Sequence, residues 1–390
     1  MVRLGAKVNL VICQKSKVDD WVNHFMVHYN ASVSVLNLTN KNSFNCFVEW
    51  TSKWSPEAYV KPLIGVINYE LAFRRPQLKQ LSDFTLLLDE SSMIQNETAK
   101  RSKFILGLNA ANVILLSGTP TSGKYENLWS QCSLLGWKIS KDLYWKQYID
   151  TEILDNEGYP IKVIRGYKNV ERLKRKLREH GAVFLKTEDV LDLPEQIDQV
   201  ISIPTTKEYR KFRKDKIVVI GDTELVGDTA LTKMLYERQL CGQYNADKLE
   251  AFRDLLESTN DRLIVFYNFT AECLAMINAC REHKRLFSIV NGNTKDLLAY
   301  ENHDNSVTFI QYQAGAMGLN LQKANKIVYF TPPLSSELFE QSKKRIHRIG
   351  QQKSCFYYYL TCRNSIEEKI YETLAMRKDY TDALFEEGGY

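Results

Sequence analysis

The most informative stretch of the sequence is residues 84–90, which read Phe-Thr-Leu-Leu-Leu-Asp-Glu. It is a short and nearly unbroken apolar run that ends in two adjacent acids. A run of this length without polar alternation is typical of a parallel strand that is buried on both faces. Acids that follow such a strand lie at the carboxyl edge of the sheet, where open α/β sheets bind their ligands. The stretch therefore predicts a buried strand with Asp89 and Glu90 at a ligand-binding edge.

Similar runs occur along the rest of the 390 residues, at 7–14, 33–38, 63–70, 113–118, 262–268, 307–312, 326–331 and 355–362. Helical patterns alternate with them: apolar residues recur at helical spacing in 248–257, and 365–374 opens with a capping box of Ser365 and Glu368. This alternation predicts an α/β fold with two halves, each a mostly parallel sheet with helices on both faces.

A polar stretch with few strands, from about Trp137 to Gln243, separates the two groups of strands. We therefore expect a first lobe at 1–195 with a helical insertion at about 137–195, a linker at 196–230, and a second lobe at 231–390. Two lobes also suit the length, since domains run to roughly 100–200 residues.

The composition describes an ordinary globular chain, with 44% hydrophobic and 25% charged residues. No run approaches the roughly 18 apolar residues that cross a bilayer, and the N-terminus has no signal-peptide core, so we expect a soluble intracellular protein. The 8 cysteines never show C-x-x-C spacing and do not cluster with the 6 histidines. This pattern predicts reduced core cysteines and no zinc or dithiol site.

The net charge of +5, which is 52 minus 47, is too small to indicate a polyanion partner, but its distribution is uneven. Residues 162–186 carry nine Lys or Arg against two acids, and residues 207–216 carry six against two. Such segments are either solvated helix faces or surfaces that contact phosphates. Composition does not separate these two interpretations.

Residues 113–120 repeat the pattern of a strand followed by polar groups. Ser117 and Thr119 offer hydroxyls at the strand end, while Gly118 and Pro120 bend the chain away. Taken alone, this stretch and the Asp89-Glu90 pair are each compatible with a plain turn. However, Ser117 follows Asp89 by about 28 residues, which leaves room for a connecting helix and a further strand. That order would place both groups at one sheet edge.

Near the C-terminus, Gln341, Arg345 and Arg348 stand at i, i+4 and i+7, which predicts one face of a helix, with His347 pointing elsewhere. Two adjacent guanidinium groups suit a triphosphate, because their forks match phosphate oxygens and stay charged. A basic, solvated helix end is the other interpretation of this segment.

Upstream, small residues at 315, 316 and 318 follow a strand and would let the backbone approach a ligand closely. A tight connection between a strand and a helix would show the same composition, so this segment is not specific by itself.

In order, these segments resemble the motif series of superfamily 2 helicases, and specifically the Swi/Snf-type DNA translocase branch. Residues 10–21 resemble motif Ia, 68–70 motif Ib, 89–92 motif II and 117–120 motif III. Residues 185–196 resemble the bridge between lobes, and 262–269, 313–324 and 341–352 resemble motifs IV, V and VI. The His-Arg-Ile-Gly-Gln tail at 347–351 is the most diagnostic part, and compact phage and bacterial members are the nearest in kind.

The resemblance implies two RecA-like lobes with ATP and Mg²⁺ between them and double-stranded DNA across both. It implies catalytic roles for Asp89 and Glu90, with Asp89 on the Mg²⁺, and for the arginine-finger candidates Arg345 and Arg348. The other implied site residues are Gln341, Gly315, Gly318 and Asn320 for the nucleotide, Ser117 and Thr119 for coupling, and Lys15, Ser16, Gly118 and Gly292 for the DNA backbone. We also expect a monomer without membrane contact.

The pattern departs from the family ahead of motif Ia, where no G-x-G-K-T phosphate loop occurs in these residues. Without its lysine and backbone amides the phosphates lose their main support, so we expect poor ATP turnover by this chain alone. The segment 118–125 nearly spells such a loop around Lys124, but Tyr125 replaces the Mg²⁺-binding hydroxyl. A second departure is Ser92, where the family often has a histidine.

Three functions therefore stay open. The first is an ATP-dependent double-stranded DNA translocase or helicase, represented in an N-terminally truncated form. The second is a hydrolysis-deficient module, derived from such a motor, that binds DNA or a partner protein. The third is a phosphate-loop enzyme built on Lys124.

Overall fold

The computed structural model describes residues 1–52, 61–118, 120, 121, 123–156, 159–185, 191–315 and 318–385. The chain divides into two compact units, Met1–Phe184 with the segment from Tyr380, and Leu185–Asp379. Among the described residues, no helix has both the length and the apolar composition that a membrane span requires.

The elements of the first unit are β1 (Val8–Cys13), α1 (Val18–Tyr29), β2 (Ser34–Asn37), α2 (Lys41–Ser52), β3 (Leu63–Asn68), α3 (Tyr69–Ala72), β4 (Phe84–Asp89), α4 (Lys100–Leu106), β5 (Asn112–Leu116), α5 (Trp129–Leu134), α6 (Lys141–Tyr148), β6 (Ile149–Asn156), β7 (Tyr159–Tyr167) and α7 (Val170–Glu179). Short 3₁₀ turns join several of them, among them η2 (Lys15–Lys17), η4 (Ser91–Ile94) and η5 (Tyr125–Leu128).

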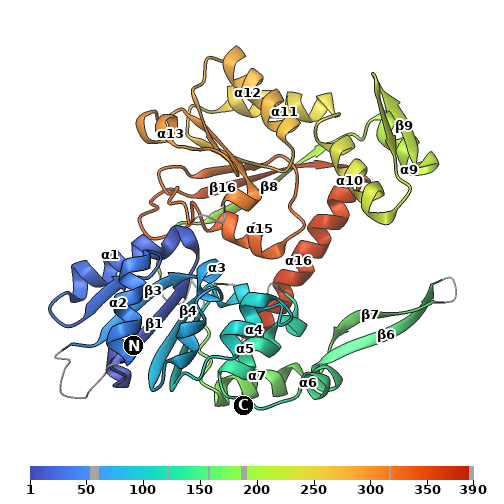
Figure 1. Ribbon diagram of the computed structural model, residues 1–390. Helices are drawn as coiled ribbons and strands as arrows, with labels where there is room; N and C mark the ends of the chain where they lie inside the picture. Colours follow the sequence, from blue (N-terminus) through green and yellow to red (C-terminus); the bar gives the residue numbers. More distant parts are fainter. Residues whose placement is uncertain are drawn as a thin grey trace. The chain divides into compact units, whose positions relative to one another are not determined.

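The first unit is built on a parallel sheet in the order β2-β3-β1-β4-β5 (Figure 1). Alternate residues of β1 enter different cores, because successive side chains of a strand point to opposite faces. Leu10 packs with Phe47 of α2 on one face, whereas Val11 packs with Phe25 of α1 on the other. Helices therefore cover both faces of this sheet, as the apolar runs predict.

The insertion that follows β5 has a core of its own, centred on Tyr144, Tyr148 and Leu173. It is not purely helical, which corrects the expectation for 137–195. Strands β6 and β7 form an antiparallel ribbon between α6 and α7 (Figure 1). The turn-prone residues 155–160 lie where β6 ends and β7 begins, and residues 157 and 158 of that turn are outside the described residues.

The elements of the second unit are β8 (Gln196–Ile203), α9 (Lys207–Asp215), β9 (Ile217–Ile220), β10 (Thr223–Val226), α10 (Ala230–Cys241), α11 (Ala246–Ser258), β11 (Leu263–Tyr267), α12 (Thr270–Glu282), β12 (Phe287–Val290), β13 (Lys295–Asp296), α13 (Leu298–Asn302), β14 (Val307–Gln311), α14 (Tyr312–Gly315), β15 (Lys326–Tyr329), α15 (Ser336–Lys343), β16 (Cys355–Cys362) and α16 (Ile366–Phe385).

The second unit has a seven-stranded sheet in the order β13-β12-β14-β11-β15-β16-β8, in which only the β12-β13 pair is antiparallel among the described strands. Val265 of β11 packs with Phe252 of α11 in one core, and Phe266 packs with Phe339 of α15 in the other. Each unit is thus an α/β lobe with helices on both faces of its sheet.

The stretch 196–230, which the sequence led us to expect as a linker, is folded into the second unit. Strand β8 pairs in parallel with β16 along its whole length, from Gln196 beside Cys355 to Ile203 beside Cys362. Because β8 is an edge strand, most of its side chains are exposed and half of its residues are polar, so its sequence lacks the apolar run of the inner strands. The polar composition thus reflects an edge position.

The start of α16 also differs by one residue from the predicted capping box. The hydroxyl of Ser365 accepts a hydrogen bond from the amide of Glu367 at 3.1 Å, and Glu368 accepts one from the amide of Asn364 at 2.9 Å. The same two side chains therefore cap the helix, with their partners shifted along the chain.

Candidate functional site

In the first lobe, parallel strand register brings the predicted residues to one sheet edge. Strand β4 pairs with β1, with Leu88 beside Ile12, and with β5, with Asp89 beside Leu116. The residues that follow these strands are Lys15 and Ser16 in η2, Glu90 after β4, and Ser117 and Gly118 after β5. Thr119 lies outside the described residues.

Two aromatic residues fix the acids after β4. The indole nitrogen of Trp21 donates a hydrogen bond of 2.8 Å to Oδ2 of Asp89. The hydroxyl of Tyr69 donates to the carbonyls of Asp89 at 2.9 Å and Glu90 at 3.3 Å. These roles could not be predicted from the sequence, since Trp21 is 68 residues from Asp89. Both contacts orient the acid pair without neutralising it.

Glu90 has left-handed backbone angles, with φ 55° and ψ 60°. For a residue with a Cβ this conformation costs roughly 1–2 kcal/mol, and such outliers concentrate at functional sites. The hydrogen bond from Tyr69 to the Glu90 carbonyl lies directly after this bend. The chain therefore turns sharply between its two acids and the η4 turn.

The carboxylates at this edge produce a negative electrostatic field, which shifts the pKa values of neighbouring groups. Burial, together with the carboxylates of Asp89, Asp20 and Glu70, raises the pKa of the Cys13 thiol to about 12, against an opposing effect of Lys17. Burial and Asp89 likewise raise the pKa of Tyr69. Such a field favours a bound cation over an additional anion.

A glutamine links the segment after β4 to the one after β5. Gln131 of α5 accepts a hydrogen bond from the Ser91 hydroxyl at 2.9 Å, and its amide donates to the carbonyl of Pro120 at 2.7 Å. Gln95 donates to the same carbonyl at 3.3 Å. Ser92, the departure from the family pattern, is buried beside this network. Gln131 was absent from the sequence prediction, because a glutamine in a helix has no distinctive pattern.

A cavity of about 640 Å³ lies beside this edge, at the ends of β1, β2 and β3. Its lining is Lys15, Val18, Asp19, Thr39, Asn68, Glu70 and Leu71. The amide of Asn68 donates to Glu70 at 2.7 Å, which holds one of the two acids in place. Among the described residues of this lining, Lys15 is the cation, so it is the group there that suits a phosphate.

The loop-like segment around Lys124 has a different role. The ring of Tyr125 is fully buried and stacks on Tyr167, with 4.3 Å between the ring centroids. The carbonyl of Tyr125 accepts a hydrogen bond from Tyr144 at 2.7 Å. Tyr125 therefore belongs to the core of the insertion and cannot replace a metal-binding hydroxyl, which removes the basis of the third function.

In the second lobe, the residues of motifs V and VI are joined directly. Arg348 donates a hydrogen bond from Nη1 to the side-chain oxygen of Asn320, and the amide of Leu321 donates to the carbonyl of Arg345 at 3.1 Å. Gly318 has a φ of 67°, a left-handed angle that glycine adopts without strain. Gly315 ends α14, just after β14.

The expected helix through Gln341, Arg345 and Arg348 is wrong in its second half. Helix α15 ends at Lys343, and Arg345 and Arg348 lie in turns beyond it. The carbonyl of Arg345 bonds to Leu321 instead of continuing a helix. Gln341 remains on α15, where its amide donates to Glu337 at 3.3 Å. The two arginines thus lie against motif V, apart from the Gln341 face.

A second glutamine holds the turn that carries the arginines. The side-chain amide of Gln351 donates to the carbonyls of Gln322 at 3.2 Å, Ala324 at 2.8 Å and Ile346 at 3.2 Å. His347 bonds instead to the carbonyl of Pro194 at 2.8 Å, so it does point away from Arg348 as expected. Sequence reasoning identified the His-Arg-Ile-Gly-Gln tail but assigned no role to its glutamine.

Gly292 lies in the turn after β12, at the carboxyl edge of the seven-stranded sheet of the second lobe. It is exposed, and a Cβ added there would meet no atom within 4 Å. Close packing therefore does not explain a glycine at this position.

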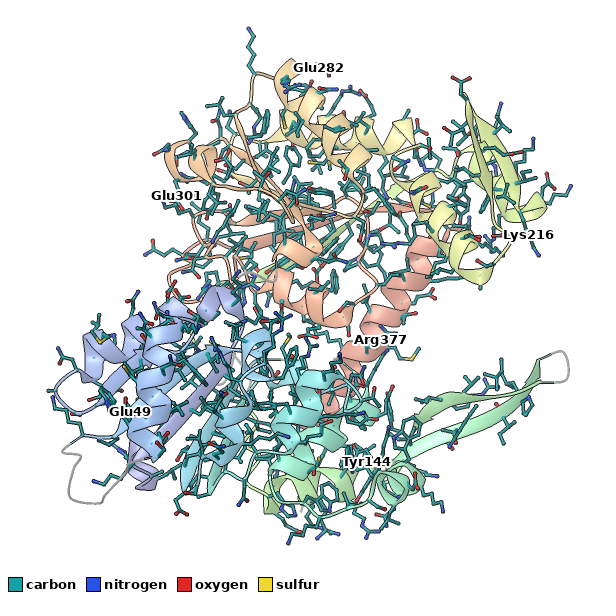
Figure 2. The ribbon with its side chains drawn as sticks, in the orientation of Figure 1. Glu49, Tyr144, Lys216, Glu282, Glu301 and Arg377 are labelled. Carbon is teal, nitrogen blue, oxygen red and sulfur yellow. The ribbon has the colours of Figure 1, made fainter. Side chains whose placement is uncertain are left out.

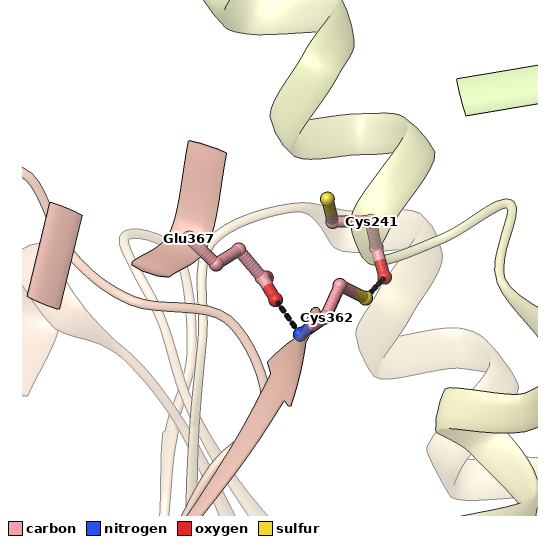
Figure 3. Close-up of side chains that lie close together, drawn as sticks. All are labelled: Cys241, Cys362 and Glu367. Atoms are coloured by element: carbon pink, nitrogen blue, oxygen red, sulfur yellow. Dashed lines mark hydrogen bonds between the residues drawn. The ribbon is translucent and has the colours of Figure 1, made fainter. Parts of the chain in front are cut away.

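A buried polar cluster in the second lobe is formed by residues of α10, β16 and α16 (Figure 3). The ligand atoms of Cys241, Cys362 and Glu367 lie within 4.8 Å of one another. However, the ammonium of Lys248 already binds both carboxylate oxygens of Glu367, at 2.6 and 2.7 Å. Burial also raises the pKa of the Cys241 thiol, which opposes the thiolate that a metal needs. The cluster is therefore a buried ion pair and a poor metal site.

The profile of the SNF2-related domain matches residues 4–246, and that of the helicase conserved C-terminal domain matches residues 247–350. The chain is 23% identical to the DNA repair and recombination protein RAD54-like of Gallus gallus, over 83% of this chain and 52% of the relative. It is 22% identical to the SWI/SNF-related matrix-associated actin-dependent regulator of chromatin subfamily A member 1 of Mus musculus, over 97% and 39%.

A bacterial relative is the putative ATP-dependent helicase/translocase YwqA of Bacillus subtilis, at 23% identity over 80% of this chain and 36% of the relative. The chain spans about half or less of the length of these curated relatives. Among solved structures, the Sulfolobus solfataricus SWI2/SNF2 ATPase core in complex with dsDNA matches 98% of this chain and 83% of that chain, at 19% identity and a TM-score of 0.40. The chain belongs to the SNF2-related family of superfamily 2.

Proposed function

We propose that this chain is the motor core of an ATP-dependent double-stranded DNA translocase. The observation that supports this most directly is the oriented acid pair, Asp89 and Glu90, at the carboxyl edge of the first lobe, next to the polar segment after β5. Proteins of this family use ATP, typically with Mg²⁺, and the proposal assigns the same use to this chain.

The residues of the first lobe suit a magnesium ion. Mg²⁺ prefers hard carboxylate oxygens whose orientation is fixed by further hydrogen bonds, and Asp89 is fixed in this way by Trp21. The negative field that raises the pKa of Cys13 points to the same charge preference. When bound, Mg²⁺ would neutralise charge on the nucleotide phosphates.

The other residues act on water, charge and coupling. Glu90 would orient and deprotonate the attacking water, from the sharp bend that follows β4. Arg345 and Arg348 would stabilise the phosphate charge that develops in the transition state, and Asn320 holds Arg348 beside motif V. Gln131 would transmit movement from the acid segment to Pro120, along with Ser117 and Thr119.

The same proposal assigns the remaining residues by family position. Gln341, Gly315 and Gly318 would contact the nucleotide, and Lys15, Ser16, Gly118 and Gly292 would contact the DNA backbone. Backbone contacts fix position without reading sequence, so binding should depend strongly on salt and weakly on sequence.

A second candidate function, which the sequence analysis left open, is a module derived from such a motor. On that view the chain binds duplex DNA, or a partner protein, and does not hydrolyse ATP. Measuring ATP turnover distinguishes the two functions, because a module that only binds duplex DNA would bind it without hydrolysing ATP.

The test is DNA-stimulated ATP hydrolysis by the protein expressed from its natural gene. We expect Glu90→Gln to lower kcat by about 100-fold or more, and Arg348→Ala to lower it by about 1000-fold. Lys124→Ala is the matched control. It should retain turnover, because the next residue, Tyr125, is buried in the core of the insertion and the segment does not serve as a phosphate loop. Full activity of Glu90→Gln would refute the assignment, and duplex binding without any turnover by the unsubstituted protein would favour the second function.

A further inference from the structure

Helix α9, in the second lobe, presents four cations on one face. Lys207, Arg210, Lys211 and Lys214 are exposed and stand at i, i+3, i+4 and i+7, so they share one side of the helix. The opposite side carries Tyr209 and Phe212, which are buried in the core of the lobe. This helix belongs to residues 207–216, one of the two basic segments that the sequence analysis left with two interpretations.

The helix is held firmly on the lobe. The hydroxyl of Thr206 accepts a hydrogen bond from the amide of Tyr209 at 3.1 Å and caps the first turn. The hydroxyl of Tyr209 accepts one from the amide of Ile366 at 2.8 Å, and Arg213 donates to the carbonyl of Asn364 at 2.9 Å. The helix also packs on β9, close to Lys216, which Figure 2 labels. Its outer face is therefore a preorganised surface.

The four cations differ from those of α7, the other basic helix. On α7, Lys174 pairs with Glu171 at 2.8 Å, and Glu179 pairs with Lys176 at 2.5 Å and Arg175 at 3.9 Å. On α9, within the part of the chain that the structure describes, none of the four cations has an ion pair within 4.0 Å. The positive charge of α9 is thus left for an external partner.

The charge of this segment is large for the chain. Residues 207–216 hold six cations and two acids, a net charge of +4, compared with +5 for all 390 residues. Like charges at i,i+3 and i,i+4 destabilise a helix by roughly 0.2–0.5 kcal/mol per pair. An anion along the face would relieve this repulsion.

We propose that the outer face of α9 is an additional contact for the phosphate backbone of nucleic acid, separate from the motif residues of the lobe. This inference rests on the proposed function, because it adds an anchor to a duplex that the motor already binds. From Lys207 to Lys214 the helix rises about 10 Å. Each strand of duplex DNA carries one charge per about 3.4 Å of axis, so the face can neutralise two or three phosphates of one strand.

The experiment measures duplex affinity against salt for two triple variants with the same change in charge. The α9 variant is Lys207→Gln, Lys211→Gln and Lys214→Gln. The control on α7 is Arg175→Gln, Lys176→Gln and Arg178→Gln, whose cations have intramolecular partners. Glutamine keeps nearly the helix propensity of lysine, and a thermal melt of each variant checks that the fold is retained.

We expect the slope of log Kd against log salt to fall by about 2–3 in the α9 variant and by less than about 1 in the control. An unchanged slope in the α9 variant, or an equal fall in both variants, would overturn the contact. A variant that binds duplex normally but loses a polyglutamate probe would also overturn it, since the face would then serve an acidic protein. Failure of the unsubstituted protein to bind duplex would refute the proposed function itself and this contact with it.

Discussion

Removing the ammonium of Lys248 should unfold the second lobe far more readily than any surface change. Its Nζ lies 2.6 and 2.7 Å from the two oxygens of Glu367, and both side chains are fully buried. Glu367 also accepts a hydrogen bond from the amide of Cys362 at 2.9 Å. Burial alone would lower the pKa of Lys248, but Glu367 and the neighbouring thiols outweigh it and raise that pKa.

The magnitude follows from what each substitution leaves behind. Lys248→Met keeps the volume but strands a buried carboxylate, which should cost about 3–5 kcal/mol of unfolding free energy. Glu367→Gln keeps the acceptor for Cys362 but strands a buried ammonium, at a similar cost. The double variant leaves no buried charge, so it avoids the cost of the unpaired charge that each single variant carries. We therefore expect the double variant to be more stable than either single one.

The assay is hydrogen exchange of the β16 amides in increasing urea, because this reports opening of the second lobe even if the two lobes unfold separately. Both single variants should lose protection at lower urea, and the double variant should recover most of it. Losses that simply add in the double variant would refute the reasoning, as would a loss below about 1 kcal/mol in Lys248→Met. Exposed Lys284→Met is a control for the methionine itself.

Two further predictions concern other buried groups of the second lobe. Burial raises the pKa of Glu272 from 4.5 to about 7. The folded chain therefore retains a proton that the unfolded chain loses, and about 3 kcal/mol of stability, present below pH 4.5, is lost as the pH rises to 7. Glu272→Gln should remove that pH dependence from urea midpoints. Gln351→Leu leaves three carbonyls without their donor and should cost about 1–3 kcal/mol, seen as faster exchange in 318–324, whereas exposed Gln352→Leu should change little.

Inner strands could be predicted from the sequence, because burial on both faces leaves a continuous apolar run. Residues 84–89 and 263–267 show this, and they became β4 and β11. The edge strand β8 could not be predicted, since it has a neighbour on one side alone and carries polar side chains. A strand is recognised in the sequence by the apolar run that burial requires, so a strand with little burial shows no such run.

The sheet edges followed from the strands, but the contacts at those edges did not. A side chain after each parallel strand must lie at the same edge, so Asp89 and Ser117 could be placed from order alone. The bond from Trp21 to Asp89 joins positions with no periodic relation. The end of α15 was missed for the same reason, because the carbonyl of Arg345 is bound by a residue 24 positions earlier, Leu321.

Both lobes use an uncharged glutamine to join their motif segments. Gln131 joins the acid segment to Pro120, and Gln351 joins the arginine turn to the segment after β14. An amide donates and accepts hydrogen bonds without adding charge, so it fixes the geometry of a loop and leaves its field unchanged. The negative edge of the first lobe and the arginines of the second thus keep their opposite charges, which the proposed ATP chemistry requires, while neutral side chains set their positions.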